Sequence, residues 1–288
     1  MITEFTVLGG DERLKYMAED FCEQGFSVKL FGFDSENDYC ETDFQEKLRE
    51  ILRETKALIL PVPASRDGIN INSPLCNSDI PIQTVVENLN SECRVFCGMA
   101  GKLSDVFFKK GIRVYDYAMR DEFSVRNAVP TAEGVCAILI NELPITLRFA
   151  NIFITGYGKT ARACAKLFSS LGSHVTVAAR RCSSLATANS EGYEALYIRE
   201  LHRHIHKADA VINTVPALII DEKIIDNIRL HCPLVEIASA PYGIDFDYAE
   251  KRGLKVINTP SLPGKTSPKT AGIIIGDTVL NIIREGQE

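Results

Sequence analysis

The sequence predicts an α/β protein with two open α/β domains and a cleft between them. Two observations favour this fold class. Short apolar runs alternate with stretches of helical periodicity along the 288 residues, which is typical of parallel sheets covered by helices. Residues 150–181 also show an apolar run, a glycine-containing turn, a helical stretch and a second apolar run, which is the order of a dinucleotide-binding unit. We therefore expect the C-terminal domain to be a Rossmann NAD(P)-binding fold.

The glycine turn of this unit suits a bound diphosphate. Gly156 can adopt the backbone angles of a sharp strand-to-helix turn, and Gly158 lacks a side chain that would hold the main chain away from the phosphates. Ala161 is small enough for the helix and the sheet to touch. The amides at the start of the helix would then point at the diphosphate. The cofactor-binding residues predicted here are Gly156, Tyr157, Gly158, Lys159, Thr160 and Ala161.

Two arginines follow the second strand of this unit, where an NAD-binding protein usually carries an acidic residue for the ribose 2′-hydroxyl. Arg180 and Arg181 stand at this strand end, and arginine suits a 2′-phosphate through its charge and its bidentate hydrogen bonds. The sequence thus predicts NADP as the cofactor, not NAD. The alternative is a turn that uses glycine for packing only, with the two arginines as a solvated surface pair.

Composition limits the partners and the compartment. The chain carries 38 Asp and Glu against 32 Lys and Arg, which argues against nucleic acid or an anionic membrane as the main partner. No stretch approaches the roughly 20 apolar residues of a membrane span, and Met1 is not followed by a signal sequence. The nine cysteines are scattered without a Cys-x-x-Cys pair, which suits a reducing compartment. We expect a cytoplasmic protein.

The N-terminal domain is predicted to span residues 1–128, completed by a C-terminal helix within residues 266–288. A long polar loop at 64–80 leaves the carboxyl end of a buried strand, where open α/β sheets place their ligands. The predicted strands of this domain are 5–8, 28–33, 57–60, 94–97 and 112–115. The predicted helices are 12–24, 44–55 and 102–110, with the closing helix at 267–284.

A linking helix is predicted within residues 129–148. Thr131 can cap a helix that runs to about Leu143, and Pro144 kinks or ends it. The Rossmann domain follows at 149–265. Its predicted strands are 150–155, 174–178, 208–213, 234–238 and 255–258.

Small or polar residues follow the later strands of the Rossmann domain. Such residues let a nicotinamide and its ribose come close to the backbone at the carboxyl end of the sheet. The further cofactor-binding residues predicted on this basis are Thr214, Val215, Pro216, Ala238, Ser239, Leu262 and Pro263.

Cations and hydroxyl groups are expected to face the cleft between the domains. Two or three cations with backbone amides would bind a small dicarboxylate well. The alternative is that part of this set consists of surface residues or helix caps. The predicted substrate-binding residues are Arg13, Ser65, Asn127, Thr131, Ser239, Lys265 and Thr270.

The catalytic residues predicted for this cleft are Arg120, Asp121, Glu133 and Lys269. Asp121 and Glu133 are the carboxylates that could serve as a base, because a cleft can raise the pKa of a carboxyl group toward neutrality. Glu133 could equally be an acidic residue of a first helical turn, stabilised by the helix dipole.

The histidines indicate neither a metal site nor a hydroxy-acid dehydrogenase. His202, His204 and His206 alternate in a stretch with charged neighbours, and a helix would spread them around its circumference, so we expect a solvated face and no metal. The last histidine is His231. Dehydrogenases of hydroxy acids usually need a histidine beside the nicotinamide, and the absence of a later histidine argues against a D-2-hydroxy-acid dehydrogenase.

Several motifs, in order along nearly the whole chain, resemble the family of dipicolinate synthase A subunits. The C-terminal half is similar, more loosely, to shikimate and alanine dehydrogenases. Besides the glycine turn, the motifs are Gly9-Gly10-Asp11-x-Arg13, Leu60-Pro61-Val62-x-Ala64, Asn127-x-x-Pro130-Thr131-x-Glu133-Gly134, Ile212-Asn213-Thr214-Val215-Pro216, and Leu262-Pro263-Gly264 with Pro268-Lys269-Thr270-Ala271-Gly272.

This resemblance implies an NADP-linked oxidation of dihydrodipicolinate, or of its hydroxytetrahydro precursor from the lysine pathway, to dipicolinate during sporulation. It also implies a flavoprotein-like B subunit of dipicolinate synthase as partner, assembly as a homo- or hetero-oligomer, and a place in the mother-cell cytoplasm. A planar dicarboxylate suits the predicted cationic cleft. Because the product ring is aromatic, orientation against the nicotinamide matters more than a strong base. Two alternatives stay open: an NADP-dependent dehydrogenase of another small acid, similar to shikimate dehydrogenase, and a non-catalytic NADP-binding scaffold for a partner protein.

Overall fold

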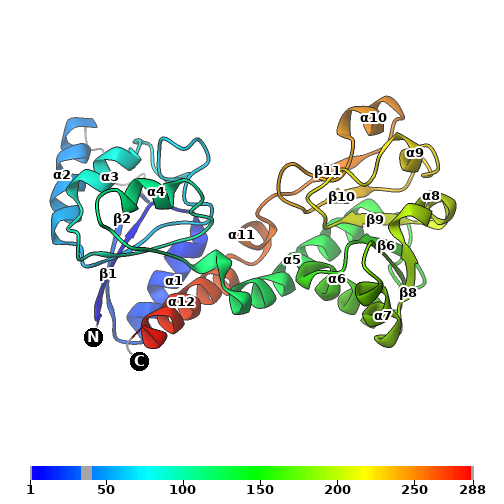
Figure 1. The fold of residues 1–288 in the computed structure, drawn as a ribbon, viewed down its shortest axis with the longest axis horizontal. Helices are drawn as coiled ribbons and strands as arrows, with labels where there is room; N and C mark the ends of the chain where they lie inside the picture. Colours follow the sequence, from blue (N-terminus) through cyan, green and yellow to red (C-terminus); the bar gives the residue numbers. More distant parts are fainter. Residues whose placement is uncertain (1, 34–40, 287–288) are drawn as a thin grey trace. The chain divides into compact units, whose positions relative to one another are not determined.

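A computed structural model describes residues 2–33 and 41–286 of the chain. The chain divides into two compact units: unit 1 consists of Met1–Ser124 and Pro268–Glu288, and unit 2 of Val125–Ser267. Each unit contains a parallel sheet with helices (Figure 1). The predicted class of two α/β domains is therefore confirmed. The division after Ser124 comes slightly before the one predicted after residue 128.

The sheet of unit 1, within the described residues, has the strand order β2-β1-β3-β4-β5, with every neighbouring pair parallel. Its strands are short. The three inner strands β1, β3 and β4 are largely buried because both faces of the sheet are covered, whereas the edge strands β2 and β5 are more exposed. The strands are β1 (Glu4–Leu8), β2 (Ser27–Phe31), β3 (Ala57–Ile59), β4 (Arg94–Cys97) and β5 (Val114–Asp116).

Helices cover the two faces of this sheet and create two apolar cores. In Figure 1, α2, α3 and α4 lie on one face, and α1 lies beside α12 on the other. Leu48 and Leu52 of α2 fill the first core, whereas Met17 of α1 and Val279 of α12 fill the second. The helices are α1 (Glu12–Glu23), α2 (Glu41–Glu54), α3 (Ile82–Asn88), α4 (Leu103–Phe108), α12 (Pro268–Glu285), and the single turn η1 (Tyr117–Met119).

The sheet of unit 2, again within the described residues, has the order β11-β10-β9-β6-β7-β8, and all the pairs are parallel. This is the doubly wound Rossmann order, in which the chain leaves a central pair of strands in opposite directions. The strands are β6 (Asn151–Thr155), β7 (His174–Ala179), β8 (Glu194–Tyr197), β9 (Ala210–Asn213), β10 (Leu234–Glu236) and β11 (Val256–Asn258).

Several short elements of unit 2 were given no bounds in the sequence analysis. α7, α9, α10 and α11 are short, and β8 is a short strand at the edge of the sheet. The complete set in this unit is α6 (Lys159–Ser170), α7 (Cys182–Ser190), η2 (Ile198–Glu200), α8 (Leu201–His204), η3 (Ile205–Lys207), α9 (Glu222–Ile225), α10 (Phe246–Lys251) and α11 (Leu262–Thr266), together with most of α5 (Asp121–Glu142).

The predicted start of the linking helix is wrong. α5 begins at Asp121, and Pro130 lies inside it, so Thr131 is an interior residue and not a cap. Its hydroxyl donates to the carbonyl of Asn127 at 2.8 Å, which is the backward bond that threonine makes within helices. The helix ends at Glu142, before Pro144, as predicted. None of the helices in the described residues is both long enough and apolar enough to span a bilayer.

The two helices of the second core of unit 1 approach each other through a glycine. A Cβ atom built on Gly272 of α12 would lie 2.2 Å from the carbonyl oxygen of Arg13 and 3.0 Å from the amide nitrogen of Met17, both in α1. Only glycine allows this backbone approach. The C-terminal helix therefore depends on one glycine to reach its place in unit 1.

We expect Gly272→Ala to lower the free energy of unfolding by about 1–3 kcal/mol, the usual range for overpacking, because the added methyl group must push α12 away from α1. Urea denaturation at neutral pH measures this. Arg284→Ala, an exposed change in the same helix, serves as the control and should stay within about 0.5 kcal/mol of wild type. Equal stability of Gly272→Ala and wild type would contradict the packing argument.

Candidate functional site

The glycine turn of unit 2 lies at the carboxyl end of β6, against the end of β9. Gly156 has φ +84°, a conformation that favours glycine. A Cβ atom on it would lie 2.7 Å from both Thr214 Oγ1 and Val215 Cγ2. Thr214 in turn donates its hydroxyl to the carbonyl of Thr155 at 2.7 Å. The turn is thus held close to the residues that follow β9.

The start of α6 is open for an anionic group. Gly158 occupies the N-cap position, and no side chain makes a capping hydrogen bond there. A Cβ atom on Gly158 would meet no atom within 4 Å, so the backbone conformation and the free space do not by themselves require glycine. Amides at a helix start, with open space before them, fit a diphosphate. Ala161 is fully buried, which lets α6 lie close to the sheet.

The position of this turn in the sheet is the usual one for a dinucleotide. β6 and β9 are neighbours at the point where the strand order reverses. In doubly wound sheets, ligands bind outside the carboxyl ends of the strands at that reversal point. The residues of unit 2 therefore fit a dinucleotide cofactor.

Tyr157 is turned to the neighbouring loop. Its hydroxyl donates to Glu191 Oε2 at 2.5 Å, and Arg162 of α6 also binds Glu191. Burial and the bond to Glu191 raise the pKa of the Tyr157 phenol. This side chain thus ties the glycine turn to the start of the loop before β8.

Arg180 lines a cationic hollow. It directly follows β7, and the hollow beside it has a volume of about 400 Å³. Arg199 and Lys223 also line it, and Asp221 is the acidic residue among the lining side chains. The Asp221 carboxylate accepts the amide of Ile224 at 3.1 Å. The hollow therefore carries an excess of positive charge next to the end of β7.

The two predicted arginines differ in their surroundings. Both are exposed, but Arg181 occupies the N-cap position of α7 and is not among the residues that line the hollow. Arg199 lies over the ring of Tyr197, with its Cζ 4.6 Å from the ring centre. Arg180 and Arg199 thus form the arginine pair at this hollow.

A buried polar network under the strand ends was not predicted from the sequence. Thr155 donates to Asn213 Oδ1 at 2.5 Å, and Asn213 Nδ2 donates to both carboxylate oxygens of Glu236, at 2.7 and 2.8 Å. All three side chains are fully buried. A single sign of it was present in the sequence: Glu236 stands inside the apolar run Leu-Val-Glu-Ile.

The remaining predicted cofactor residues fall into two groups. Ala238 and Ser239 follow β10, with Ser239 exposed. Leu262 is 4% exposed and packs in the core of unit 2, close to Gly134 of α5, and Pro263 is also buried. The side chain of Leu262 thus stabilises the unit itself.

Arg13, a predicted substrate residue, makes its strongest bonds inside unit 1. It is 6% exposed, and its Nε and Nη2 each donate to Asp11 at 2.8 Å. Nη2 also donates to the carbonyl of Val62 at 2.6 Å. Burial acts to raise the pKa of Asp11, but the bond and the charge of Arg13 outweigh it, and this pKa lies below its usual value. The pair holds the first strand-end turn to the end of β3.

Ser65 belongs to a compact turn in the polar loop. Its hydroxyl donates to Asp67 Oδ1 at 3.1 Å and accepts the amide of Gly68 at 2.9 Å. The amides of Asn70 and Ile69 donate to Asp67 and lower the pKa of its carboxyl to about 2. Ser65 therefore helps to shape the loop.

The other predicted residues of unit 1 lie near the starts of α5 and α12. Arg120 binds Glu122 at 2.8 Å and Glu285 at 2.7 Å, and these bonds raise its pKa, with Glu285 the larger cause. Asp121 begins α5, while Lys269 and Thr270 are exposed in the first turn of α12. Arg120 thus joins the start of α5 to the end of α12.

In unit 2, the predicted residues of the passage between domains lie on α5 and α11. Asn127 and Thr131 bond to each other within α5, Glu133 is exposed on the same helix, and Lys265 is exposed on α11. The predicted substrate and catalytic residues thus come from both units. Their common role in one cleft stays a prediction.

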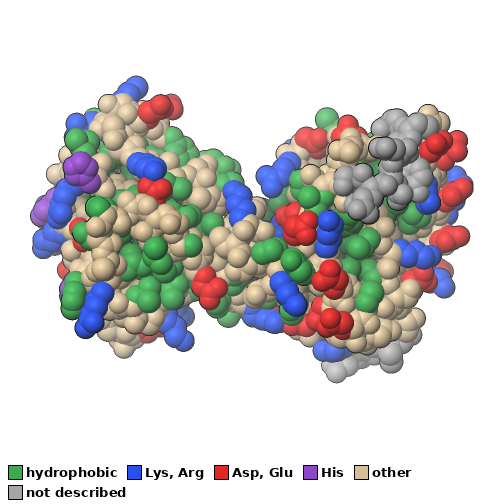
Figure 2. Space-filling model, turned by 180° about the vertical axis from the view of Figure 1, so that it is seen from behind, with side chains coloured by type: hydrophobic (Ala, Val, Ile, Leu, Met, Phe, Trp, Pro, Cys, Tyr) green, Lys and Arg blue, Asp and Glu red, His purple; other side chains and the backbone are tan. Residues whose placement is uncertain are grey.

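The histidines and cysteines form no metal cluster in the part of the chain that the structure describes. On the face drawn in Figure 2, His side chains lie at the surface beside Lys and Arg side chains. Burial raises the pKa of the Cys93 thiol to about 12. Such buried thiols are unreactive.

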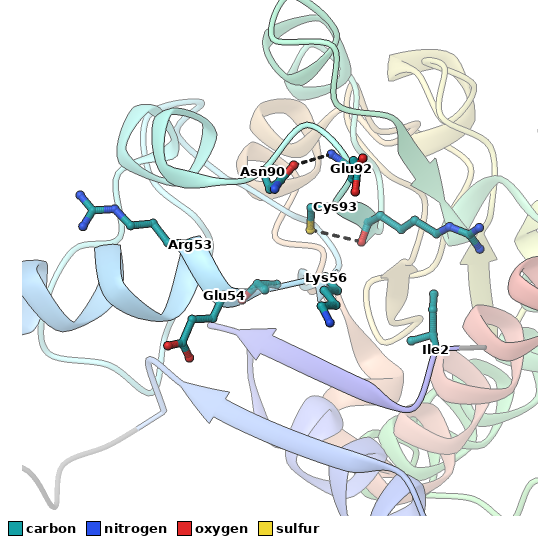
Figure 3. Close-up of a pocket in the computed structure, with 9 residues that line it drawn as sticks. Ile2, Arg53, Glu54, Lys56, Asn90, Glu92 and Cys93 are labelled. Atoms are coloured by element: carbon teal, nitrogen blue, oxygen red, sulfur yellow. Dashed lines mark hydrogen bonds between the residues drawn. The ribbon is translucent and has the colours of Figure 1, made fainter.

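A second hollow, of about 350 Å³, lies in unit 1, at the end of the sheet away from the carboxyl ends of its strands (Figure 3). It is lined by residues before β3 and β4, at the amino ends of these strands. Arg53, Glu54 and Lys56 point in different directions in Figure 3. Since its cations do not converge and acidic side chains stand among them, this hollow is not an anion site.

Comparison with known proteins assigns the two halves of the chain separately. Residues 4–118 match the family model of the N-terminal domain of the dipicolinate synthase A subunit. Residues 146–267 match the model of the acetohydroxy acid isomeroreductase NADPH-binding domain. The second match agrees with the glycine turn and the strand order, so unit 2 is a Rossmann-type domain for a nicotinamide cofactor.

Relatives of the whole chain give the same answer. The dipicolinate synthase A subunit of Bacillus subtilis (strain 168) is 28% identical over 99% of this chain and 97% of that protein. The crystal structure of the dipicolinate synthase A subunit from Bacillus halodurans has a TM-score of 0.86 at 27% identity, with 98% of each chain covered. A transhydrogenase from Sinorhizobium meliloti shares the fold, with a TM-score of 0.69 at 12% identity over 97% of this chain and 92% of that one. The resemblance seen in the sequence motifs is confirmed.

The two glycines of the turn should respond differently to alanine. Gly158→Ala should leave the melting temperature unchanged, because the methyl group enters free space, but should weaken nicotinamide cofactor binding about tenfold or more by occupying the path of the diphosphate. Gly156→Ala should lower both stability and binding, because its Cβ would lie 2.7 Å from Thr214 Oγ1 and Val215 Cγ2. Calorimetry and thermal denaturation measure the two effects. Normal binding by a stable Gly158→Ala protein would contradict the diphosphate assignment.

Proposed function

We propose that the chain is a member of the family of dipicolinate synthase A subunits, and that it is the NADP-dependent dehydrogenase component that oxidises dihydrodipicolinate, or its hydroxytetrahydro precursor, to dipicolinate. The similarity to these A subunits and the match to a nicotinamide cofactor domain both support an oxidoreductase. The observation that carries the proposal is the similarity along the whole chain. The relatives, like this chain, combine this N-terminal domain with a Rossmann domain in one polypeptide.

The choice of NADP rests on the charge around Arg180. The cationic hollow at the end of β7 stands where the adenosine ribose of a bound dinucleotide lies in Rossmann domains. A 2′-phosphate there would meet Arg180, with Arg199 and Lys223 nearby. Charge-assisted hydrogen bonds of this kind are worth about 1.5–3 kcal/mol each. An NAD ribose would find no acidic partner among the residues directly after β7, which are Arg180 and Arg181.

The residues of the chain have distinct tasks in this reaction. The turn at Gly156 and Gly158 and the start of α6 would hold the diphosphate, and the strand ends at Thr214 and Ala238 would hold the nicotinamide half. When bound, a nicotinamide cofactor supplies a hydride acceptor. Oxidation of dihydrodipicolinate transfers a hydride, which is two electrons and a proton, to NADP and releases a second proton. The hydroxytetrahydro precursor must in addition lose one molecule of water.

The substrate would be held by side chains that suit its two carboxylates. Lys265, Lys269 and Thr270 can offer N–H and O–H donors, and these three side chains are proposed as contacts. Asp121 and Glu133 are proposed as acceptors of the released proton. Because the product is aromatic, the chain mainly has to orient the substrate and exclude competing reactions.

The remaining parts of the proposal concern partners and setting. We infer a second component from the name of the relatives, which are A subunits, and propose that it is the flavoprotein-like B subunit of dipicolinate synthase. We also propose that the complex acts in the cytoplasm of the mother cell during sporulation, as the family resemblance implies.

The first test is direct turnover. With freshly formed dihydrodipicolinate, NADP and the partner protein, we expect the absorbance of the reduced nicotinamide to rise and dipicolinate to appear in equal amounts. A panel of small acids, including shikimate, provides the comparison. Turnover of another acid alone would favour the second enzyme hypothesis. Tight NADP binding without turnover of any acid would favour a scaffold.

A second test concerns the choice of cofactor. Arg180→Ala should weaken NADP binding about 10- to 100-fold and change NAD binding little, because only NADP carries the 2′-phosphate. Arg181→Ala is the matched control and should have a smaller effect, since Arg181 does not line the hollow. Equal losses for NADP and NAD in Arg180→Ala, measured by calorimetry, would remove the assignment.

A further inference from the structure

Glu236 is a fully buried carboxylate that lies in a cage of N–H donors. Asn213 Nδ2 donates to Oε1 at 2.7 Å and to Oε2 at 2.8 Å. The amide of Ala238 donates to Oε1 at 2.9 Å, and the amide of Gly243 donates to Oε2 at 2.8 Å. A glutamate side chain can accept at both oxygens, so it satisfies this cage, whereas an amide would oppose a donor with a donor.

The loop after β10 is fixed by this cage at both ends. Ala238 and Gly243 are the first and last residues of a loop whose two end amides bind one carboxylate. Gly243 allows no side chain, because a Cβ atom would lie 2.5 Å from both Asn213 Nδ2 and the carbonyl oxygen of Val215. The loop therefore has one position relative to β9.

Asn213 links the Glu236 cage to the residues beside the glycine turn. With Nδ2 held by Glu236, its Oδ1 faces Thr155 Oγ1 at 2.5 Å and the amide of Val215 at 3.2 Å. The carbonyl of Thr155 accepts the hydroxyl of Thr214 at 2.7 Å. Glu236, Asn213 and Thr155, called here the strand-end network, thus connect the ends of β10, β9 and β6.

The strand-end network crosses the boundary between the two halves of the Rossmann fold. β6, β7 and β8 form the half that takes the adenosine nucleotide, and β9, β10 and β11 form the half that takes the second nucleotide. Thr155 belongs to the first half, and Asn213 and Glu236 belong to the second. A dinucleotide must contact both halves at once, so the offset between them decides where its nicotinamide end lies.

We propose that the strand-end network is a positioning device that sets the nicotinamide half of the site relative to the diphosphate turn. This inference rests on the proposed function, because the positioning role concerns the same nicotinamide cofactor. Its members are buried and touch the cofactor only through the residues they hold, Thr214, Val215 and the loop 238–243. A buried polar network of this kind rigidifies its surroundings when every member is satisfied, and no buried polar side-chain atom of the described residues is left without a partner.

Loss of a hydrogen bond in the network should weaken binding of the whole dinucleotide more than binding of its adenosine half. This selectivity distinguishes a positioning role from a general loss of stability. Thr155→Val keeps the shape of the side chain and removes the donor to Asn213. We expect its dissociation constant for NADP to rise about tenfold, and that for 2′-phospho-ADP-ribose, which lacks the nicotinamide, to change less than about threefold. Calorimetry on the folded, full-length protein gives both constants.

Matched variants test whether the loss of any buried threonine hydroxyl would have the same effect. Thr155→Ser keeps the hydroxyl and should restore NADP binding to near the wild-type value. Thr176→Val removes another buried threonine hydroxyl of the same sheet, one that binds Glu194 at 3.2 Å, and should not change the ratio of the two constants. Glu236→Gln, which places a donor against donors, should show the same selective loss as Thr155→Val, to a larger degree.

The outcomes separate this inference from the proposed function. Equal losses for NADP and 2′-phospho-ADP-ribose in both Thr155→Val and Glu236→Gln, or no loss in either, would overturn the positioning role. Failure of the wild-type protein to bind either ligand would overturn the proposed function, and the inference with it. Selective loss in the two variants, with rescue by serine, would support both.

Discussion

The close approach of the β6 turn to the end of β9 is the constraint on which unit 2 depends. Gly156 leaves no room for a side chain beside Thr214 and Val215, and Thr214 is bonded back to the carbonyl of Thr155. The amides of α6 are directed to the reversal point of the sheet only because this turn is so tight.

The sequence predicted those features that a local pattern determines. Continuous apolar runs indicated the buried strands, including β4 at Arg94–Cys97, and two glycines with a following helical stretch indicated the turn. Elements that depend on tertiary packing were missed. The short helix α3 and the edge strand β8 have too few residues for a clear period, and α5 continues through Pro130 because the residues around it fit a helix on both sides. Thr131, the expected cap, was therefore a poor marker of the start of this helix.

The roles of side chains were less predictable, because the same residue type can either bind a ligand or stabilise the fold. Arg13 pairs with Asp11 and Val62, and Arg120 joins two helices of unit 1, although both have the chemistry of a carboxylate-binding residue. Spacing along the chain does not show which acid an arginine will meet. Glu236 was missed for a related reason. Its donors come from residues 213, 238 and 243, and only the folded sheet brings them around its carboxylate.

The arrangement of α12 has a consequence for biosynthesis. Unit 2 is one continuous stretch, Val125–Ser267, whereas unit 1 needs Pro268–Glu288 to complete a core that begins with residues near the N-terminus. Domains generally fold as units while the chain emerges from the ribosome. Here unit 2 can reach its native state first, and unit 1 stays incomplete until the residues of α12 have been synthesised.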